Sequence, residues 1–315
     1  MFKSSFKHHL KASIPAFIIL ALMITFTSIV SPDFRKVNNI GNVLVQVTPL
    51  AIAAIGQTIV LISGNIDFSI GSVISLSSVI LALLSKMEFA GSGIVGIALA
   101  ILVGILCGTI NGMGVVLLKI PPMIMSFSLM MIIKGISVTL MPGSGGSTPK
   151  AIAKFFTLNH GIFSVMVLMM ILLYVVMIFV TSMTPFGRKL YAVGNSHQHA
   201  TESGIEAGKI KIKTYALSGL FAAVVGILLC FRMYSGNSTI GDAYSMDTVT
   251  ASILGGTSLA GGYGSLLGSF AGAGIISLIK NMLNMLDIPT SFQYIIKGVI
   301  LAISLLFFQL RGKQK

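Results

Sequence analysis

Long apolar runs, separated by short polar segments, recur along almost the whole of this 315-residue sequence. Most contain roughly 17–23 residues, which as an α-helix is enough to cross a hydrocarbon layer of about 30 Å. Only 9% of the residues are charged and 55% are hydrophobic, whereas a soluble protein of this length needs more charge to cover its surface. The runs therefore predict an all-α, polytopic bundle of transmembrane helices.

The breaks between the runs predict about ten spans. Two segments, around 56–76 and 252–274, are short or interrupted by glycine and also fit half-helices, so eight or nine spans are the alternative. We expect a single transmembrane domain over 14–310, between cytoplasmic tails at 1–13 and 311–315. The predicted spans are 14–30, 45–63, 70–86, 93–118, 121–141, 161–182, 214–232, 248–263, 265–283 and 290–309.

Lysine and arginine are distributed unevenly between the two sides of this layout. With the N-terminus inside, the cytoplasmic side receives about twice as many of them as the outer side, as the positive-inside rule requires. The net charge of +13 is thus explained by orientation signals beside the spans rather than by a nucleic-acid partner. Both termini are predicted to be cytoplasmic.

Glycine recurs every four residues in two places, at Gly104, Gly108 and Gly112 and at Gly264, Gly268 and Gly272. This spacing lines one helix face with glycine, so that a neighbouring backbone can approach closely. A solute path lined by glycine is the alternative. The segments 119–135 and 287–298 share an Ile-Pro start and an Ile-Ile-Lys-Gly end, which suggests a weak internal repeat.

A single carboxylate, Asp67, interrupts the apolar stretch "GQTIVLISGNIDFSIGSVISL" at residues 56–76. An unpaired carboxylate in hydrocarbon costs roughly 3 kcal/mol or more, so this one must have partners. Glycines on both sides permit a break in the helix, and Asp67 is placed to accept a hydrogen bond from the backbone N–H of Ser69 or Ile70. Two roles stay open: a structural cap of a broken helix, or a cap that also faces the translocation path.

The longest cytoplasmic segment is the loop at 184–213, where Pro185 ends the preceding span. Asn195 or Ser196 can cap a short polar helix over 197–203. A short helix held between two fixed spans can act as a lever for a cytoplasmic protein, and an ordinary solvated loop is the alternative. The two histidines of this helix are spaced i, i+2, so they do not share a helix face and make a poor metal site.

Motifs for nucleotide binding and catalysis are missing from the sequence. It contains no G-x-x-x-x-G-K-[ST], no G-x-S-x-G and no H-E-x-x-H. Ionisable residues expected at membrane depth are few, namely Asp67, Lys134, Lys280 and Lys297, whereas ion-coupled pumps place several carboxylates there. The sequence predicts a conduit rather than an enzyme, with a secondary transporter driven by an ion gradient as the alternative.

Five segments occur in one characteristic order along the chain. They are "ISGNIDFSIGS" (62–72), "KIPPMIMSF" (119–127), "TPFGRKLYAVGNSHQHATESGI" (184–205), "YALSGLFAAVVGIL" (215–228) and "ILGGTSLAGGYGSLLGS" (253–269). Together they resemble the permease subunits of ribose/galactose/xylose-type ABC importers, and the resemblance extends from about residue 30 to 300.

The resemblance implies the permease subunit of an ATP-driven ABC importer in the bacterial inner membrane. Such a subunit moves a ribose-like monosaccharide or a related solute inward by alternating access. The implied partners are a second permease subunit (identical or a paralogue), two cytoplasmic ABC ATPases and an extracytoplasmic sugar-binding protein. The chain itself would hold no cofactor, because the ATPases use the ATP and Mg²⁺. The sugar is not identified, and nucleoside or autoinducer cargo stays open.

The resemblance also assigns roles to residues. Those matched to the ATPase-coupling segment are Asn195, Ser196, His197, Gln198, His199, Ala200, Thr201, Glu202, Ser203 and Gly204. Those expected at a helix break or along the translocation path are Ser63, Gly64, Asn65, Asp67, Ser69, Gly71, Gly255, Gly256, Thr257 and Ser258. Tyr244 and Asp247 are expected on the face that meets the binding protein. There the family's Tyr-Glu-Leu-Asp reads Tyr-Ser-Met-Asp, so we expect partner pairing or solute choice to differ.

Overall fold

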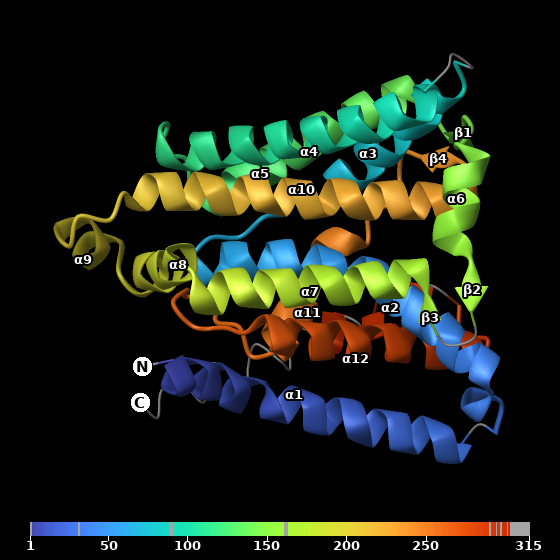
Figure 1. Cartoon of the computed structure of the whole chain (residues 1–315), viewed down its shortest axis with the longest axis horizontal. Helices are drawn as coiled ribbons and strands as arrows, with labels where there is room; N and C mark the ends of the chain where they lie inside the picture. Colours follow the sequence, from blue (N-terminus) through green and yellow to red (C-terminus); the bar gives the residue numbers. More distant parts are fainter. Residues whose placement is uncertain are drawn as a thin grey trace.

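The structure, a computed structural model, describes residues 2–30, 32–87, 91–160, 163–289, 291–293, 295–296, 298–300 and 302. Its long helices lie roughly parallel to one another (Figure 1). One end of the bundle carries α8, α9 and the start of α1, and the other carries α6 and two short sheets. We call these the α9 end and the β1–β4 end.

The elements follow one another along the chain with short connections. They are α1 (Phe2–Val30), the 3₁₀ helix η1 (Pro32–Arg35), α2 (Val37–Ile62), α3 (Ile70–Ser85), α4 (Ser92–Val116), α5 (Pro122–Leu140), β1 (Ser144–Gly145), α6 (Lys150–Thr157), β2 (Asn159–His160), β3 (Phe163–Ser164), α7 (Val165–Met183), α8 (Pro185–Asn195), α9 (His197–Glu202), α10 (Ala207–Met233), β4 (Gly236–Asn237), α11 (Tyr244–Leu254) and α12 (Leu266–Met285). Strand β1 pairs with β4, and β2 pairs with β3, both antiparallel.

Six helices of the described part are long and apolar enough to cross a membrane: α2 (from Asn39), α4, α5, α7, α10 and α12. The apolar part of α1 and the 16-residue α3 are shorter. The exposed side chains of α4, α5 and α7 are mainly Leu, Ile, Val, Met and Phe, as contact with lipid requires. A mostly helical bundle with helices able to cross a membrane is thus confirmed, whereas the count of ten spans stays a prediction. The segment 1–13, predicted as a tail, is helical from Phe2 and continuous with the first span.

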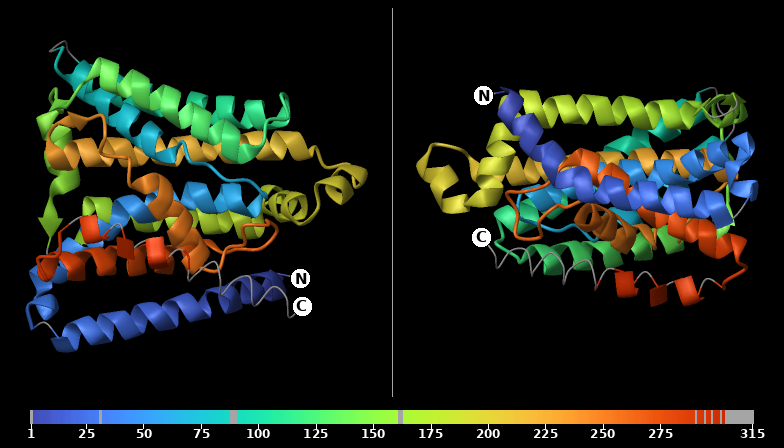
Figure 2. Two further views of the ribbon diagram at one scale, coloured as in Figure 1. Left: turned by 180° about the vertical axis from the view of Figure 1, so that it is seen from behind. Right: turned by 90° about the horizontal axis from the view of Figure 1, so that it is seen from below.

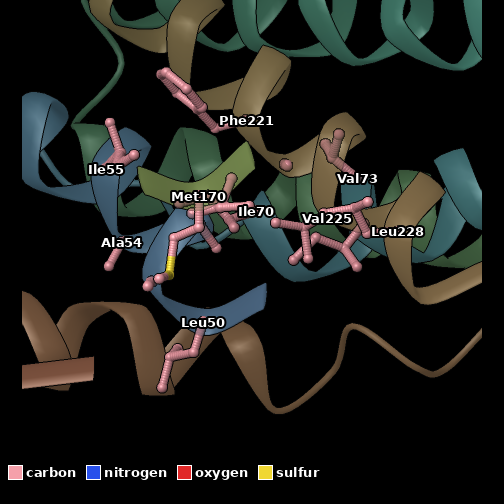
Figure 3. Packing of buried hydrophobic residues seen from close by; sticks show 14 of the residues in the cluster. Leu50, Ala54, Ile55, Ile70, Val73, Met170, Phe221, Val225 and Leu228 are labelled. Atoms are coloured by element: carbon pink, nitrogen blue, oxygen red, sulfur yellow. The ribbon is translucent and has the colours of Figure 1, made fainter. Parts of the chain in front are cut away.

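The centre of the bundle is formed by α2 and α10. Their apolar windows are 89% and 78% buried, against 22% for α5, and α10 packs against α2, α3 and α4. Figure 3 shows how the aliphatic side chains of four helices interdigitate there. The labelled residues are Leu50, Ala54 and Ile55 of α2, Ile70 and Val73 of α3, Met170 of α7, and Phe221, Val225 and Leu228 of α10.

The glycine rows bring helices into backbone contact, as predicted. A Cβ at Gly108 of α4 would collide with the carbonyl group of Tyr215 in α10, and one at Gly104 would collide with Gly219. In the second row, Gly268 of α12 packs on the backbone of Gly255. The spacing therefore serves helix packing in this structure.

Two crossings of the bundle are built from irregular chain followed by a short helix. Residues 63–69 lead into α3, and residues 238–243 lead into α11 (Figures 1 and 2). The first agrees with the half-helix considered for 56–76, whereas the second, α11 (Tyr244–Leu254), mostly precedes the segment 252–274 considered for the other. The predicted span 248–263 is too long, because α11 ends at Leu254 and the chain turns at Gly256, whose φ is +88°.

The two half-helices run in opposite directions from the middle of the bundle. Successive residues after β4 bond to residues progressively earlier in the chain, from α3 back to the irregular segment before it. Asn237 N–H donates to Ser78, Gly241 N–H to Ser75, and Ser245 Oγ to the Phe68 carbonyl. Lower down, Ser252 Oγ lies 2.9 Å from Thr58 Oγ1. Helix α3 thus runs from the middle to the β1–β4 end, and α11 from the middle to the α9 end.

The last predicted span, 290–309, lies mostly outside the described residues, as does the tail 311–315. The loop 184–213 contains a helix that the sequence reasoning did not predict, since α8 occupies Pro185–Asn195. Pro185 follows the end of α7, as expected, but it is also the first residue of α8, where its missing N–H costs nothing.

Candidate transport and coupling sites

Asp67 lies in the irregular segment before α3 and is 1% exposed. Its Oδ1 accepts hydrogen bonds from the backbone N–H of Ser69 (2.9 Å), the Ser69 hydroxyl (2.6 Å) and the Asn111 amide (3.0 Å). Its Oδ2 accepts one from the Ser218 hydroxyl at 2.8 Å. The bond from Ser69 N–H is the one predicted, although Asp67 stands two residues before Ser69, the N-cap position of α3.

The partners of Asp67 come from three different parts of the chain. Asn111 lies on α4 and Ser218 on α10, while the Tyr215 hydroxyl of α10 donates to the carbonyl of Ile66 at 3.0 Å. A break in a helix frees backbone groups that must find partners within the protein at membrane depth. These bonds supply such partners and fix the irregular segment between α4 and α10.

The other predicted path residues of this segment are also mostly enclosed. Ser63 is 1% exposed, Asn65 4% and Ser69 1%, and Gly71 is buried against Gly241 and Ser245. Gly64 is exposed and has a φ of +79°, which favours glycine. The surroundings of Asp67 agree with its structural role, and its contact with solute stays a prediction.

The second predicted break, Gly255–Ser258, follows α11 and precedes α12. Gly255 packs on Gly268, and Ser258 N–H donates to the carbonyl of Tyr263 at 2.9 Å. Thr257 is fully buried, and its hydroxyl has no hydrogen-bond partner among the described residues. The segment is a tight turn at the α9 end of the bundle.

The predicted coupling segment forms α9, which extends from the bundle (Figure 1). Ser196 is its N-cap, since its Oγ accepts from the His199 N–H at 3.2 Å. The helix covers 197–202, one residue shorter than predicted, and Gly204 follows with a φ of +77°. Glu202 accepts from Gln198 at 3.0 Å and lies 3.2 Å from His199 Nδ1. Except for Ala200, which is 4% exposed, the residues of α9 face solvent.

Helix α8 connects α9 to both helix breaks. The Tyr191 hydroxyl donates to the Gly264 carbonyl at 2.9 Å, just before α12. Gly194 lies against the carbonyl of Ile62, the last residue of α2, and against Gly262. The Gly262 N–H donates to the same Ile62 carbonyl at 2.9 Å. Helix α8 therefore contacts both the end of α2 and the segment that precedes α12.

Tyr244 and Asp247, predicted to face a binding protein, lie in the first turn of α11. Both are half-buried, and Asp247 lines a small pocket with Thr250, Ile276 and Ile300. Ser245, which stands where the family's glutamate would be, is 5% exposed and bonded to α3. The side chain at this position therefore points into the protein, and the contact of Tyr244 and Asp247 with a binding protein stays a prediction.

Sequence reasoning missed the partners of Asp67 on α4 and α10 and one ion pair. Asn111 stands beside Gly112 on the face of α4 that meets α10, and Ser218 precedes Gly219 on the facing surface, so polar residues on glycine-lined faces were the available signal. Lys134 Nζ lies 2.7 Å from Asp242 Oδ2. That pairing joins residues 108 positions apart and has no local sequence signal.

Comparison with known proteins gives one matching family and many relatives. The family described as "Branched-chain amino acid transport system / permease component" matches residues 39–305. The Ribose import permease protein RbsC of Haemophilus influenzae is 32% identical over 95% of this chain and 94% of its own length. That of Bacillus subtilis is 33% identical over 92% and 90%. The L-arabinose ABC transporter permease protein AraH of Azospirillum brasilense is 29% identical over 95% and 88%. No solved structure matches the chain significantly.

Proposed function

The chain belongs to the family described as branched-chain amino acid transport system permease components. Because its relatives include ribose and arabinose permeases, we propose that it carries a monosaccharide into the cell. It is the permease subunit of an ABC importer of the bacterial inner membrane and not an enzyme, since ATP hydrolysis belongs to a separate subunit. The relatives named for ribose and arabinose cover nearly the whole chain, which favours a sugar over an amino acid.

One observation supports the mechanism most strongly: α8 bonds to Gly264 and packs on Ile62, so α9 is mechanically joined to both helix breaks. In alternating access, ATP binding would close the ATPases and move α9. Helix α8 would pass that motion to α2 and α12, which would repack around the irregular segments. Residues 195–204 are thus the proposed ATPase-coupling segment.

We place the α9 end in the cytoplasm, together with both termini. Lys119, Arg188, Lys189, Lys209, Lys211 and Lys213 gather at or near this end in sequence, as the positive-inside rule expects. Six helices of the described residues are long and apolar enough to cross alone. Adding α1 and the two half-helices with their irregular segments, each counted as one crossing, we propose nine crossings for this part of the chain. With 290–309 as the last span, the total is ten. The chain is one transmembrane domain over 14–310, with 184–213 as its cytoplasmic coupling loop.

The proposed assembly contains two permease subunits, two ABC ATPases beneath them and an extracytoplasmic sugar-binding protein. This chain would hold no cofactor, and ATP with Mg²⁺ would bind the ATPases. Whether the second permease is identical or a paralogue is decided by the mass of the purified complex. Tyr244 and Asp247 stay a predicted contact of the binding protein, although their position in α11 requires the partner or the permease to rearrange.

Reconstitution tests the function directly. The chain should co-purify with an ABC ATPase and, in liposomes with that ATPase and the binding protein, should accumulate sugar only when ATP is supplied. Vanadate should stop this uptake, and a protonophore should leave it unchanged. Accumulation by the chain alone, or uptake abolished by the protonophore and insensitive to vanadate, would instead establish a secondary transporter.

The solute is tested separately by competition. Unlabelled ribose, arabinose, xylose and galactose, together with a nucleoside and a branched-chain amino acid, are added in excess to a tracer uptake assay. We expect one or more of the monosaccharides to compete. Competition by the nucleoside or amino acid alone would reject the sugar assignment and leave the permease assignment intact.

A further inference from the structure

An ion pair lies within the depth of the membrane and is open to its surroundings. Lys134 Nζ of α5 is 2.7 Å from Asp242 Oδ2, and each side chain is 41% exposed. Lys134 lies twelve residues after Pro122, so it is about 18 Å along a helix that rises 1.5 Å per residue. Asp242 follows Gly241, whose N–H is bonded to Ser75 within α3. Both charges therefore lie inside the layer that the helices cross, about 30 Å thick.

Contact with lipid is unfavourable for such an ion pair. Charged side chains at membrane depth face the bundle interior or a water-filled cavity, because hydrocarbon satisfies none of their hydrogen bonds. An ammonium group has three donors, and the bond to Asp242 uses one of them. The exposed part of the pair consequently requires water on that side of α5.

The neighbouring contacts show which surface is involved. Helix α5 is the least buried of the long helices, and it is attached near Lys134 by the Ser72 hydroxyl, which donates to the Met130 carbonyl at 2.9 Å. Met131 lies three residues before Lys134, on the same side of the helix, and is 49% exposed. By contrast, Asp67 is 1% exposed and fully bonded within the chain.

We propose that the surface formed by Met131, Lys134 and Asp242 lines the water-filled path of the solute. This rests on the proposed function, since it assigns the route within a permease. The donors of the ammonium group and the acceptors of the carboxylate suit a neutral polyhydroxylated solute, whose hydroxyl groups donate and accept at once. Asp67 then stabilises the protein around the path and does not line the path itself.

Thiol labelling tests the route without measuring transport. Met131→Cys and Ile132→Cys are compared in the assembled complex, in a background with Cys107→Ala and Cys230→Ala. The two positions lie at almost the same depth, because they are adjacent in the chain. Ile132 is 59% exposed but lies two residues from Lys134, so it is on a different face of the helix. A charged methanethiosulfonate that cannot cross lipid reacts with the thiolate, which forms in water.

We expect Met131→Cys to react at least about tenfold faster than Ile132→Cys, because only the former is placed against water. Equal rates, faster reaction at Ile132, or no reaction at Met131 would overturn the assignment of the path. Such a result would leave the permease function standing, because ATP-driven uptake by the wild-type complex is measured independently.

Charge variants provide a second readout. Lys134→Gln and Asp242→Asn should each lower maximal uptake several-fold while the complex still assembles with its ATPase on purification. The exchanged pair Lys134→Asp with Asp242→Lys should stay impaired, because the donor and the acceptor have then exchanged their positions on the surface that meets the solute. Full recovery of uptake in the exchanged pair would show that only mutual attraction matters, and it would reject a role in the path.

Discussion

Replacing Asp67 tests whether its carboxylate holds the irregular segment before α3. Asp67→Leu has a similar size but removes the acceptor of the Ser69 N–H. It also removes the nearer acceptor of the Asn111 amide, which keeps only the longer 3.3 Å bond to the Ser69 hydroxyl. The Ser218 hydroxyl can turn to another partner, whereas the other two donors are fixed by backbone and packing. An unsatisfied buried donor costs about 1–3 kcal/mol, so the leucine variant should lose about 2–6 kcal/mol of stability.

Asp67→Asn is the matched control, because its side-chain oxygen can still accept from Ser69 and Asn111. Its new amide group can donate to the oxygen of Ser218 in place of the lost acceptor. We expect this variant to lose no more than about 1.5 kcal/mol, the worth of one ordinary hydrogen bond.

The assay is thermal unfolding of the purified protein in detergent, followed by the loss of monodisperse protein after heating. At about 2–4 °C per kcal/mol, the leucine variant should melt at least about 4–8 °C below the wild type, and the asparagine variant at most about 3–6 °C below it, so that the leucine variant always melts lower. In a double-mutant cycle, Ser218→Ala should lower the melting temperature of the wild type more than that of the Asp67→Leu variant, because only the wild type has the bond that the substitution removes. Equal melting temperatures for the two Asp67 variants would refute the capping role.

Three further predictions concern packing, capping and charge. Gly108→Ala should lower the melting temperature by several degrees, because a Cβ there meets the backbone of α10, whereas Gly135→Ala has open space and should be neutral or slightly stabilising. Ser196→Ala should weaken α9 by about 1 kcal/mol and reduce sugar-stimulated ATP hydrolysis without preventing assembly. The hydrogen bond and charge of Lys209 hold the pKa of Glu206 below its usual 4.5, so the contribution of Glu206 is present at neutral pH and is lost as the pH falls through that lowered value. Amide exchange in the first turn of α10 should therefore separate wild type from Glu206→Gln at neutral pH and not in acid.

The sequence was sufficient to predict the helical class and most span limits, because hydropathy and breaker residues are local signals. Predicted spans such as 93–118 and 121–141 lie within two residues of α4 and α5. The glycine rows also gave correct packing faces. The helix α8 was missed because Pro185 was read only as the end of a span, although proline at the first position of a helix is equally favourable.

Long-range contacts explain the remaining differences. Nothing near Asp67 in sequence indicates that its partners are Asn111 and Ser218, since the register between helices decides which polar groups meet. The segment Tyr244–Asp247 was placed on an outer face by its match to the family's Tyr-Glu-Leu-Asp. The structure shows instead that the loop at 238–243 enters the bundle before α11 begins.

The bonding of Asp67 has a consequence for the biogenesis of this chain. Ser218 is 151 residues downstream, so at about 5–20 residues per second the ribosome needs roughly 8–30 seconds to make it after Asp67. During that interval the carboxylate has emerged without its last partner, and a half-helix as short as α3 cannot insert stably by itself. We expect the irregular segment to stay in contact with water until α10 has been made, because only then can Ser218 complete the bonding of Asp67. Nascent chains truncated before α10 should accordingly be recognised as incomplete and degraded.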